Sequence, residues 1–199
     1  MAATPIKKAK VVDKWKSKQW FTVLAPSAFD TKEIAELAAT EEENLKNRIL
    51  SLSLADVTGQ PSQSAIFTSL KFRIGDVKGK SAYTKLIGHE ISPSYIRTLS
   101  RRNRSIINVV YDVKTKDDQS VRVKLLAITG SEVSQNTKKN IYHAIMEELK
   151  KVGAEYTLDQ LMQEVIFGKF ASKIFNRLKQ ITMMRRVEVR KSEVKEQFA

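Results

Sequence analysis

Only a few segments of this chain combine residue types that a chemical site requires. Gly75–Ser81 ends in Gly79, Lys80 and Ser81 and is similar to a phosphate-binding loop. That motif, however, needs one more residue between its glycines and a following helix whose N-terminus faces the phosphates. Residues 82–87 alternate like a strand instead. We therefore expect no nucleotide site and no bound cofactor.

The histidines and paired acids do not form a catalytic or metal-binding set. His89 and His143 lie far apart and outside any cluster with ligand spacing, so no metal site is expected. Glu90 follows His89, but neighbours in a strand point to opposite faces, so a satisfied or exposed histidine is the simpler interpretation. Asp117 and Asp118 are typical turn formers. Because the chain also has no cysteine, we expect that it is not an enzyme.

Arginines gather beside two segments of strand-like pattern. Residues 107–113 and 121–127 alternate apolar with polar side chains around a turn at 115–119, which predicts a β-hairpin. The arginines before this hairpin and around a later strand at 187–189 are Arg97, Arg101, Arg102, Arg104, Arg185, Arg186 and Arg190. A sheet whose apolar face covers a core can offer such a basic rim to phosphates. The alternative is that these side chains only solvate the surface.

The composition favours a polyanionic partner. The 199 residues include 35 Lys and Arg against 22 acids, which gives a net charge of +13 and a pI near 9.8. Such an excess repels itself unless a polyanion is near, and nucleic acid is the expected partner. The 42% of hydrophobic residues suffice for a core. No apolar run is long enough for a membrane span or a signal peptide, so we expect a soluble, cytoplasmic protein that does not bind membranes.

Residues 1–18 are predicted to form a basic arm. Its lysines, set against the single acid Asp13, are Lys7, Lys8, Lys10, Lys14, Lys16 and Lys18. With almost nothing apolar to bury, the arm should be ordered only on a polyanion. Trp15 lies among the lysines and could stack on a base, whereas Trp20 opens an apolar strand at 20–24 and is expected in the core.

The remaining pattern predicts an α+β fold with a mainly antiparallel, β-barrel-like core and C-terminal helices packed on it. We expect a short helix over about 41–47, capped by Thr40. The acidic segment 30–43 should face away from nucleic acid and suits a basic protein neighbour. Strands over 50–54 and 66–74 should pair around a turn at 59–61, and Pro93 should begin a helix.

Three helices and a last strand are expected in the C-terminal part. The first should end at Gly153, the second runs from a cap at Thr157 to Gly168, and the third passes through Ile174–Leu178. We therefore divide the chain into the arm, 1–18, and a single domain, 19–199. That domain is strand-rich over 19–130, helical over 131–181, and closed by a strand over 183–191.

Several motifs resemble those of one archaeal and eukaryotic ribosomal protein family, called S-one-e or S-three-Ae. The motifs, in chain order, are Asp13–Phe21 with Ala25, Pro26 and Phe29, then Ser53–Asp56, Lys71–Lys80, Asp112–Thr115, Phe167–Phe175 and Arg185–Lys191. The C-terminal run resembles archaeal members most. The chain departs from the family pattern at Thr182 and Met183, where an aromatic residue and proline are usual, and its Lys138 and Lys139 stand in a helix that usually holds more arginines.

The resemblance implies a structural constituent of the small ribosomal subunit that supports translation. It places the protein on the platform, near the mRNA exit and the 3′ end of the 16S rRNA. The implied partners are 16S rRNA, neighbouring platform proteins and mRNA near the exit. Phosphate contacts and shape recognition suit such a basic, non-catalytic chain. The alternatives are a free-standing RNA- or DNA-binding regulator or chaperone, and an enzyme that uses the Gly75–Ser81 loop; co-sedimentation with small subunits in moderate salt would separate them.

We predict that residues 1–12 are disordered in the free protein and become ordered on rRNA. The reason is that this lysine-rich segment has few groups that could bury hydrogen bonds of its own. Amide hydrogen exchange with and without rRNA measures this. Strong protection in the isolated protein would contradict the prediction.

Overall fold

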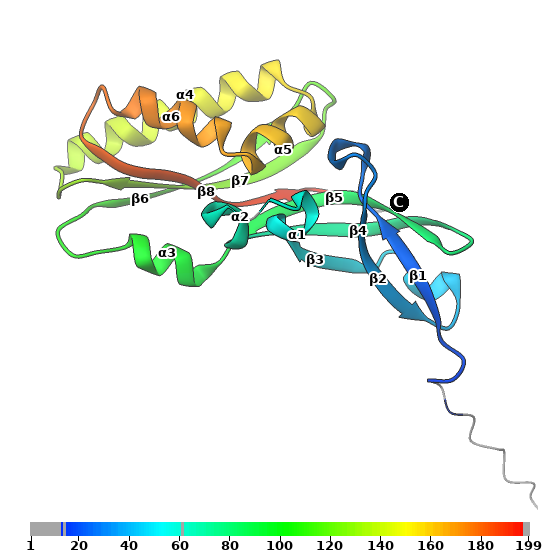
Figure 1. Cartoon of the computed structure of the whole chain (residues 1–199). Coiled ribbons are helices and arrows are strands. Elements are labelled where there is room, and N and C mark those ends of the chain that lie inside the picture. Colours follow the sequence, from blue (N-terminus) through cyan, green and yellow to red (C-terminus); the bar gives the residue numbers. More distant parts are fainter. Residues whose placement is uncertain (1–12, 14, 61, 197–199) are drawn as a thin grey trace, which may run out of the picture.

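An eight-stranded mixed sheet organises the molecule (Figure 1). The computed structural model describes residues 13, 15–60 and 62–196. The strands are β1 Gln19–Leu24, β2 Glu33–Ala39, β3 Ile49–Ser53, β4 Thr68–Lys78, β5 Ser81–Ile91, β6 Ile106–Lys114, β7 Ser120–Thr129 and β8 Met184–Val194. The predicted hairpins β3–β4 and β6–β7 both form, and the last strand rejoins the sheet as expected.

The strand β5 is the branch point of the sheet. One edge of β5 pairs with β4 along most of its length. Its other edge is shared, because β1 pairs in parallel with residues 81–83 and β8 pairs antiparallel with residues 88–90. From there the sheet continues through β8 and β7 to β6 on one branch and through β1 to β2 on the other. The α+β class with mostly antiparallel pairing is therefore confirmed, and the sheet is open rather than closed.

Three helices cover one face of the β6–β7–β8 branch. They are α4 Gln135–Glu155, α5 Leu158–Ile166 and α6 Lys169–Leu178. Alternate strand residues such as Val123 and Val189 meet helix residues such as Ile145 and Phe170 in the main core. The predicted cap of α5 is confirmed, since Thr157 and Gln160 form a capping box. The helix α3, Pro93–Leu99, lies on the opposite side of the sheet (Figure 1).

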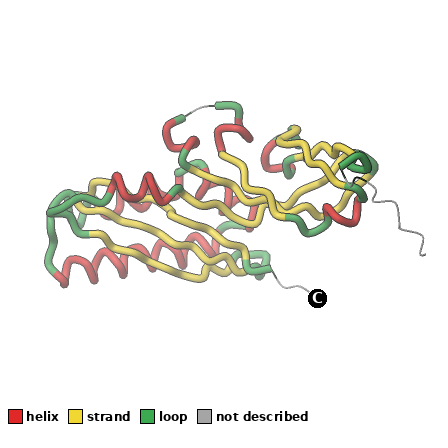
Figure 2. The backbone as a smooth tube through the Cα atoms, turned by 90° about the horizontal axis from the view of Figure 1, so that it is seen from below, coloured by secondary structure: helices red, strands yellow, loops and turns green. Residues whose placement is uncertain are grey.

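The β1–β2 hairpin has a small core of its own. Phe21 and Val23 of β1 pack with Leu45, Ile74 and Ala82. The strands β4 and β5 contribute to both cores and join them into one elongated layer (Figure 2). The division of the chain at residues 18 and 19 stays a prediction, and β1 begins at Gln19.

Between β2 and β4 the chain forms short helices where the sequence predicted a longer helix or the ends of strands. The helix expected over 41–47 is a 3₁₀ turn, Glu42–Leu45, without the cap expected from Thr40. It ends early because Asn47, at a positive φ of 62°, turns the chain so that its N–H pairs with Ile74 O. The β3–β4 connection contains α1, Leu54–Thr58, and α2, Gln63–Ile66. Leu54 and Ile66, expected in strands, are therefore helical; Ser53 Oγ caps α1 by accepting from Asp56 N–H.

Two features of the β1–β2 hairpin differ from the sequence prediction. The strand β2 was not expected, since its Glu, Ala and Leu residues favour helix, and pairing with β1 overrides that preference. Trp20 is 61% exposed instead of buried. Phe21 and Val23 take the core face of β1, so Trp20 and Thr22 must point outwards.

Gly153 lies inside α4, which continues to Glu155, so the prediction that Gly153 ends this helix is wrong. The glycine permits contact between α4 and the end of β6. A Cβ on Gly153 would lie 2.7 Å from Lys114 O and 2.7 Å from Val113 Cγ1. The absence of a side chain here serves packing, not helix termination.

We therefore predict that Gly153→Ala destabilises the protein by about 1–3 kcal/mol, because the added methyl group overpacks the α4–β6 contact. Alanine at an uncrowded helix position would instead stabilise by roughly 1 kcal/mol relative to glycine. Urea denaturation measures the difference. The control is Gly75→Ala, whose Cβ would lie 4.0 Å from its nearest neighbour, Tyr83 O. Equal stability of the wild type and Gly153→Ala would contradict the prediction.

Candidate nucleic-acid interface

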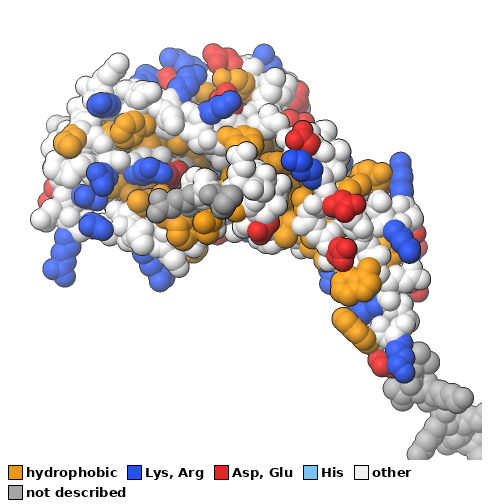
Figure 3. All heavy atoms as spheres, viewed as in Figure 1, with side chains coloured by type: hydrophobic (Ala, Val, Ile, Leu, Met, Phe, Trp, Pro, Cys, Tyr) orange, Lys and Arg blue, Asp and Glu red, His pale blue; other side chains and the backbone are white. Residues whose placement is uncertain are grey.

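The fold brings Arg101, Arg102 and Arg104 to the same end of the sheet as Arg185 and Arg186. The loop that holds Arg101, Arg102 and Arg104 leads into β6 at Ile106. Ile106 pairs with Ile128 of β7, and Ile128 pairs in turn with Arg186 of β8. These two segments are about 80 residues apart in the chain but lie only two strands apart in the sheet. Neighbouring strands are about 5 Å apart. Basic side chains gather at this end, near α3 (Figure 3).

Most arginines of this surface carry uncompensated charge. Among the described residues, no ion pair or hydrogen bond involves the guanidinium groups of Arg97, Arg101, Arg102, Arg104, Arg185 and Arg190. Arg104 is half-buried and the others are exposed. Free guanidinium groups can hold phosphates with two hydrogen bonds each. We name Arg97, Arg101, Arg102, Arg104, Arg185 and Arg186 the arginine end. Arg190 lies further along β8, between Val189, which pairs with Leu125, and Lys191, which pairs with Lys124, and so in the middle of the strand.

Arg186 is the exception, because it has protein partners. Its Nε donates to Glu188 Oε1 at 2.8 Å, and Tyr95 of α3 also contacts it. Partial burial is the largest single effect and lowers the pKa of Arg186, but the charges and hydrogen bonds of Glu188 and Tyr95 together raise it more, so the net pKa is raised. Among the seven predicted arginines, Arg186 alone pairs with an acid in the described part of the chain. Arg186 thus links α3 to β8 as well as adding charge.

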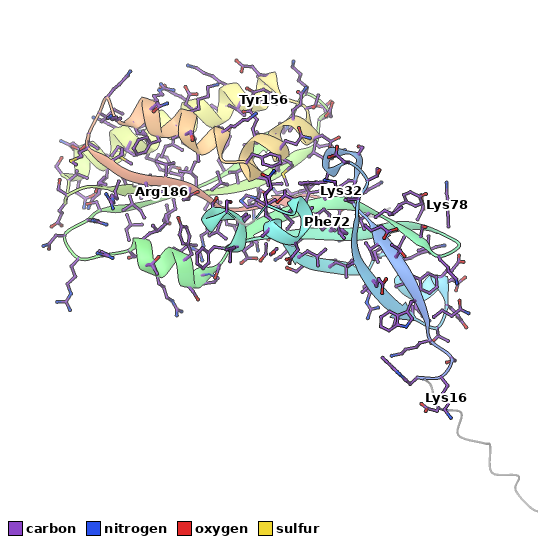
Figure 4. All side chains as sticks on the ribbon, viewed as in Figure 1. Lys16, Lys32, Phe72, Lys78, Tyr156 and Arg186 are labelled. Atoms are coloured by element: carbon purple, nitrogen blue, oxygen red, sulfur yellow. The ribbon has the colours of Figure 1, made fainter. Side chains whose placement is uncertain are left out.

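The basic residues of the N-terminal segment lie at the far end of the molecule. In Figure 4, Lys16 lies at the lower right end of the molecule and Arg186 lies far from it, on β8 in the left part. Lys18 Nζ lies 4.2 Å from the ring centroid of Trp15, whose side chain is 63% exposed. Lys7, Lys8, Lys10 and Lys14 lie outside the described residues. The predicted RNA-binding residues therefore divide between two separate surfaces.

Trp20 joins Trp15 as an exposed ring near Lys18, and sequence reasoning missed it. The signal was present, since Thr22 shares its strand face while Phe21 and Val23 share the other. The acids at 41–43 lie on the same hairpin, because Ala39 of β2 pairs with Gln19 of β1. This second surface therefore carries both signs of charge.

The sheet face around Asp112 is neutralised by ion pairs. Asp112 accepts two hydrogen bonds from Arg122, at 2.8 and 3.0 Å, and one from Lys195 at 2.7 Å. The hydrogen bond from Arg122, followed by that from Lys195, lowers the pKa of Asp112 well below its usual range. Glu193 pairs in the same way with Lys191 and Lys124. These cations are already occupied by carboxylates and are weaker candidates for phosphate.

His89 is a structural residue between β5 and β8. Its Nε2–H donates to Val189 O at 2.9 Å, and its Nδ1 accepts from Ser192 Oγ at 2.6 Å. Both ring nitrogens are satisfied in the neutral form, as the sequence predicted. Burial lowers the pKa of His89 to about 4. Glu90 points to the other face and pairs with Lys71 at 2.7 Å.

The loop Gly75–Ser81 is the tip of the β4–β5 hairpin. Gly79 takes a positive φ of 60° there, and Ser81 begins β5 directly. The helix that a phosphate-binding loop requires is thus replaced by a strand. A cleft of about 1140 Å³ lies where β5 passes from β1 to β8, and the ion pair of Arg73 with Glu196, at 2.9 Å, lines it. No group of acids and histidines able to hold a metal occurs in the described part of the chain.

An open sheet with uncompensated arginines at one end and exposed tryptophans at the other is typical of proteins that bind nucleic acid. Comparison with known proteins then identifies the family. The model of the Ribosomal S3Ae family matches residues 6–197, and the chain belongs to that family. The resemblance seen in the sequence motifs is confirmed. A ribosomal protein of this family is structural and not an enzyme.

The archaeal relatives are similar over nearly the whole chain. The small ribosomal subunit protein eS1 of Sulfurisphaera tokodaii is 37% identical over 187 residues, which cover 94% of this chain and 96% of that protein. The proteins of the same name from Saccharolobus islandicus strain L.S.2.15 and Saccharolobus solfataricus are each 37% identical over 184 residues, or 92% of this chain and 88% of theirs. No helix in the described residues is long and apolar enough to cross a membrane.

We predict that His89 makes the folded protein sensitive to mild acid. The pKa of His89 is lowered from 6.5 to about 4 by burial, so the unfolded chain binds a proton there before the folded chain does. The contribution of His89 to the free energy of unfolding is then complete above the pKa that His89 has in the unfolded chain. This contribution is lost as the pH falls towards the pKa that His89 has in the folded protein. The expected loss is about 2 kcal/mol between about pH 7 and about pH 5. Urea denaturation across this range should show that loss in the wild type and a smaller one in His89→Gln; equal losses would contradict the prediction.

Proposed function

We propose that this protein is a structural constituent of the small ribosomal subunit and binds 16S rRNA on the platform, near the mRNA exit and the rRNA 3′ end. The observation that carries the proposal is the arginine end, where two distant segments present guanidinium groups without acidic partners. The names of the archaeal relatives support the subunit. The protein then works in the cytoplasm, within the ribosome.

The two basic surfaces suggest how the protein holds RNA. The arginine end would grip phosphates, since a planar guanidinium matches two phosphate oxygens. At the other end, Trp15 and Trp20 offer ring faces for unpaired bases beside Lys16 and Lys18. Because these ends lie at opposite extremes of an elongated molecule (Figure 4), the protein would bridge separate RNA segments instead of one continuous groove. Neighbouring platform proteins and mRNA near the exit are the further partners.

A free-standing RNA-binding regulator or chaperone is the second candidate, because an uncompensated arginine surface would serve it equally well. The two functions differ in how tightly the protein binds to the small ribosomal subunit. A ribosomal constituent should remain with small subunits during sedimentation through moderate salt, since many phosphate contacts act together. A regulator should dissociate under the same conditions and appear in the light fractions.

We predict that two triple variants weaken rRNA binding and flatten its salt dependence. The variants replace Arg101, Arg102 and Arg104, or Arg185, Arg186 and Arg190, by alanine. If each arginine makes one phosphate contact, the slope of log affinity against log salt should fall by about 0.9 per arginine on duplex RNA and about 0.7 on single strands. Binding to a platform fragment of 16S rRNA, across a salt series, measures this. Lysine replacements should keep the charge and lose the two-bond geometry.

The matched control removes equal charge at the opposite end of the β6–β7 hairpin. Lys114, Lys116 and Lys150 are exposed there, near the turn and the end of α4. Their triple alanine variant should leave the slope close to that of the wild type. Circular dichroism checks that all variants fold. If the arginine variants fold and their slopes match the control, the arginine end does not bind rRNA and the N-terminal lysines become the principal anchor.

A further inference from the structure

The strand β6 is an edge strand without the usual protection. It is nine residues long and pairs with β7 at every position without a register shift. Its charged residues, Asp112 and Lys114, lie at one end only. Val110, at 53% exposure, and the exposed Ile106 present apolar side chains to solvent. A long, regular, apolar edge offers a row of free backbone N–H and C=O groups to any other extended chain.

The other two edges of the sheet are guarded. The strand β2 carries Glu33 and Glu36, and the β1–β2 ladder has a register shift at Val23 and Leu24. The strand β3 is only five residues long and follows Arg48. Charge, irregularity and shortness are the devices by which proteins prevent strand addition. The strand β6 is long and regular and has its charges at one end only, which indicates that this edge is covered in the assembled state.

A groove runs beside this edge, between β6 and α4. It is shallow and largely open to solvent, with a volume of about 340 Å³. The lining side chains that concern recognition are Ile106, Asn108, Lys138, Lys139, Tyr142 and His143. No acid lines the groove among the described residues, and the ring of Tyr142 stands edge-on to that of His143 with centroids 6.0 Å apart. The groove thus combines apolar surface with two positive charges.

We propose that β6 and this groove form a docking site for an extended, acidic segment of another protein, which adds to the sheet as a further strand. Backbone pairing with β6 would supply affinity, and alternate side chains of the added strand would enter the groove. Carboxylates on those side chains would meet Lys138 and Lys139. This partner is separate from the RNA bound by the arginine end, so the inference does not depend on the proposed function.

Two other occupants fit the edge less well. RNA would use the lysines and the backbone donors, but its phosphates accept only, and its 2′-OH and base donors do not form the regular row of alternating donors and acceptors that an extended peptide presents to β6. A second copy of this chain would pair β6 with β6, but its net charge of +13 opposes the approach of an equally charged molecule. An extended acidic peptide would pair with the backbone N–H and C=O groups of β6 and also offer carboxylates to the lysines.

The experiment uses the full chain, labelled with ¹⁵N, and two short blocked peptides that alternate valine with glutamate or valine with lysine. The glutamate peptide should slow amide exchange at alternate residues of β6, because only those N–H groups point away from β7. The lysine peptide should bind roughly tenfold more weakly. Binding through side chains alone would not give the alternating pattern and would overturn strand addition.

Charge-reversal variants test the groove itself. The double variant Lys138→Glu and Lys139→Glu should bind the lysine peptide in preference to the glutamate peptide. The matched control, Lys169→Glu and Lys173→Glu on α6, changes the net charge equally at exposed positions and should keep the wild-type preference. The proposal is overturned if neither peptide protects β6, if both double variants respond alike, if an oligouridine protects β6 better than the glutamate peptide, or if the free chain dimerises through β6.

Discussion

The close approach of β5 and β8 is the contact on which the rest of the fold depends. Gly88 lies so near Ser192 that a Cβ would overlap the Ser192 carbonyl oxygen. One residue further, His89 bonds to Ser192 and Val189 through both ring nitrogens. These contacts join the strands of the first half of the chain to the last strand. Besides these contacts, the packing of the main core and the ion pair of Arg73 with Glu196 hold the β6–β7–β8 branch against β4 and β5.

The same contact explains why a neutral, buried histidine is useful here. Each hydrogen bond of the ring is made with a partner from β8. The side chain therefore connects β5 to β8, two strands that share only three paired positions. A buried polar group is costly unless it is bonded, and a fully bonded one specifies a single register. Desolvation keeps the ring uncharged. The cost is sensitivity to protonation.

Charge is distributed unevenly over this framework. Carboxylates neutralise the cations around Asp112 and Glu193, whereas most guanidinium groups at the arginine end have none nearby. Surface ion pairs contribute only about 0 to 1 kcal/mol each to stability, so leaving a cation unpaired costs the fold little. It leaves the charge available to a phosphate. The strand β6 likewise exposes backbone groups that the guarded edges β2 and β3 do not.

The sequence predicted much of the fold because several of its patterns are local. Alternation located β6, β7 and β8, the apolar stripe of Ile141 and Ile145 located α4, and the residues Thr157 and Gln160 located the start of α5. The prediction from sequence failed where pairing with residues far apart in the chain decides the local structure. The helix-favouring residues of β2 form a strand because β1 lies beside them, and Gly153 looks like a helix end although it serves a contact with Lys114.

For the candidate site, too, some features follow from the sequence and others only from the tertiary structure. The sequence by itself determined the basic character of the chain, the arginine runs and the absence of cysteine chemistry, because composition and spacing are local properties. Only the tertiary structure decided that Arg101–Arg104 and Arg185–Arg186 share one end of a sheet while Lys16 and Lys18 lie at the other. It also decided which cations are already paired and which edge is open. Strand order and register are set by contacts between residues far apart in the chain, and the pattern of a single strand does not specify its neighbour.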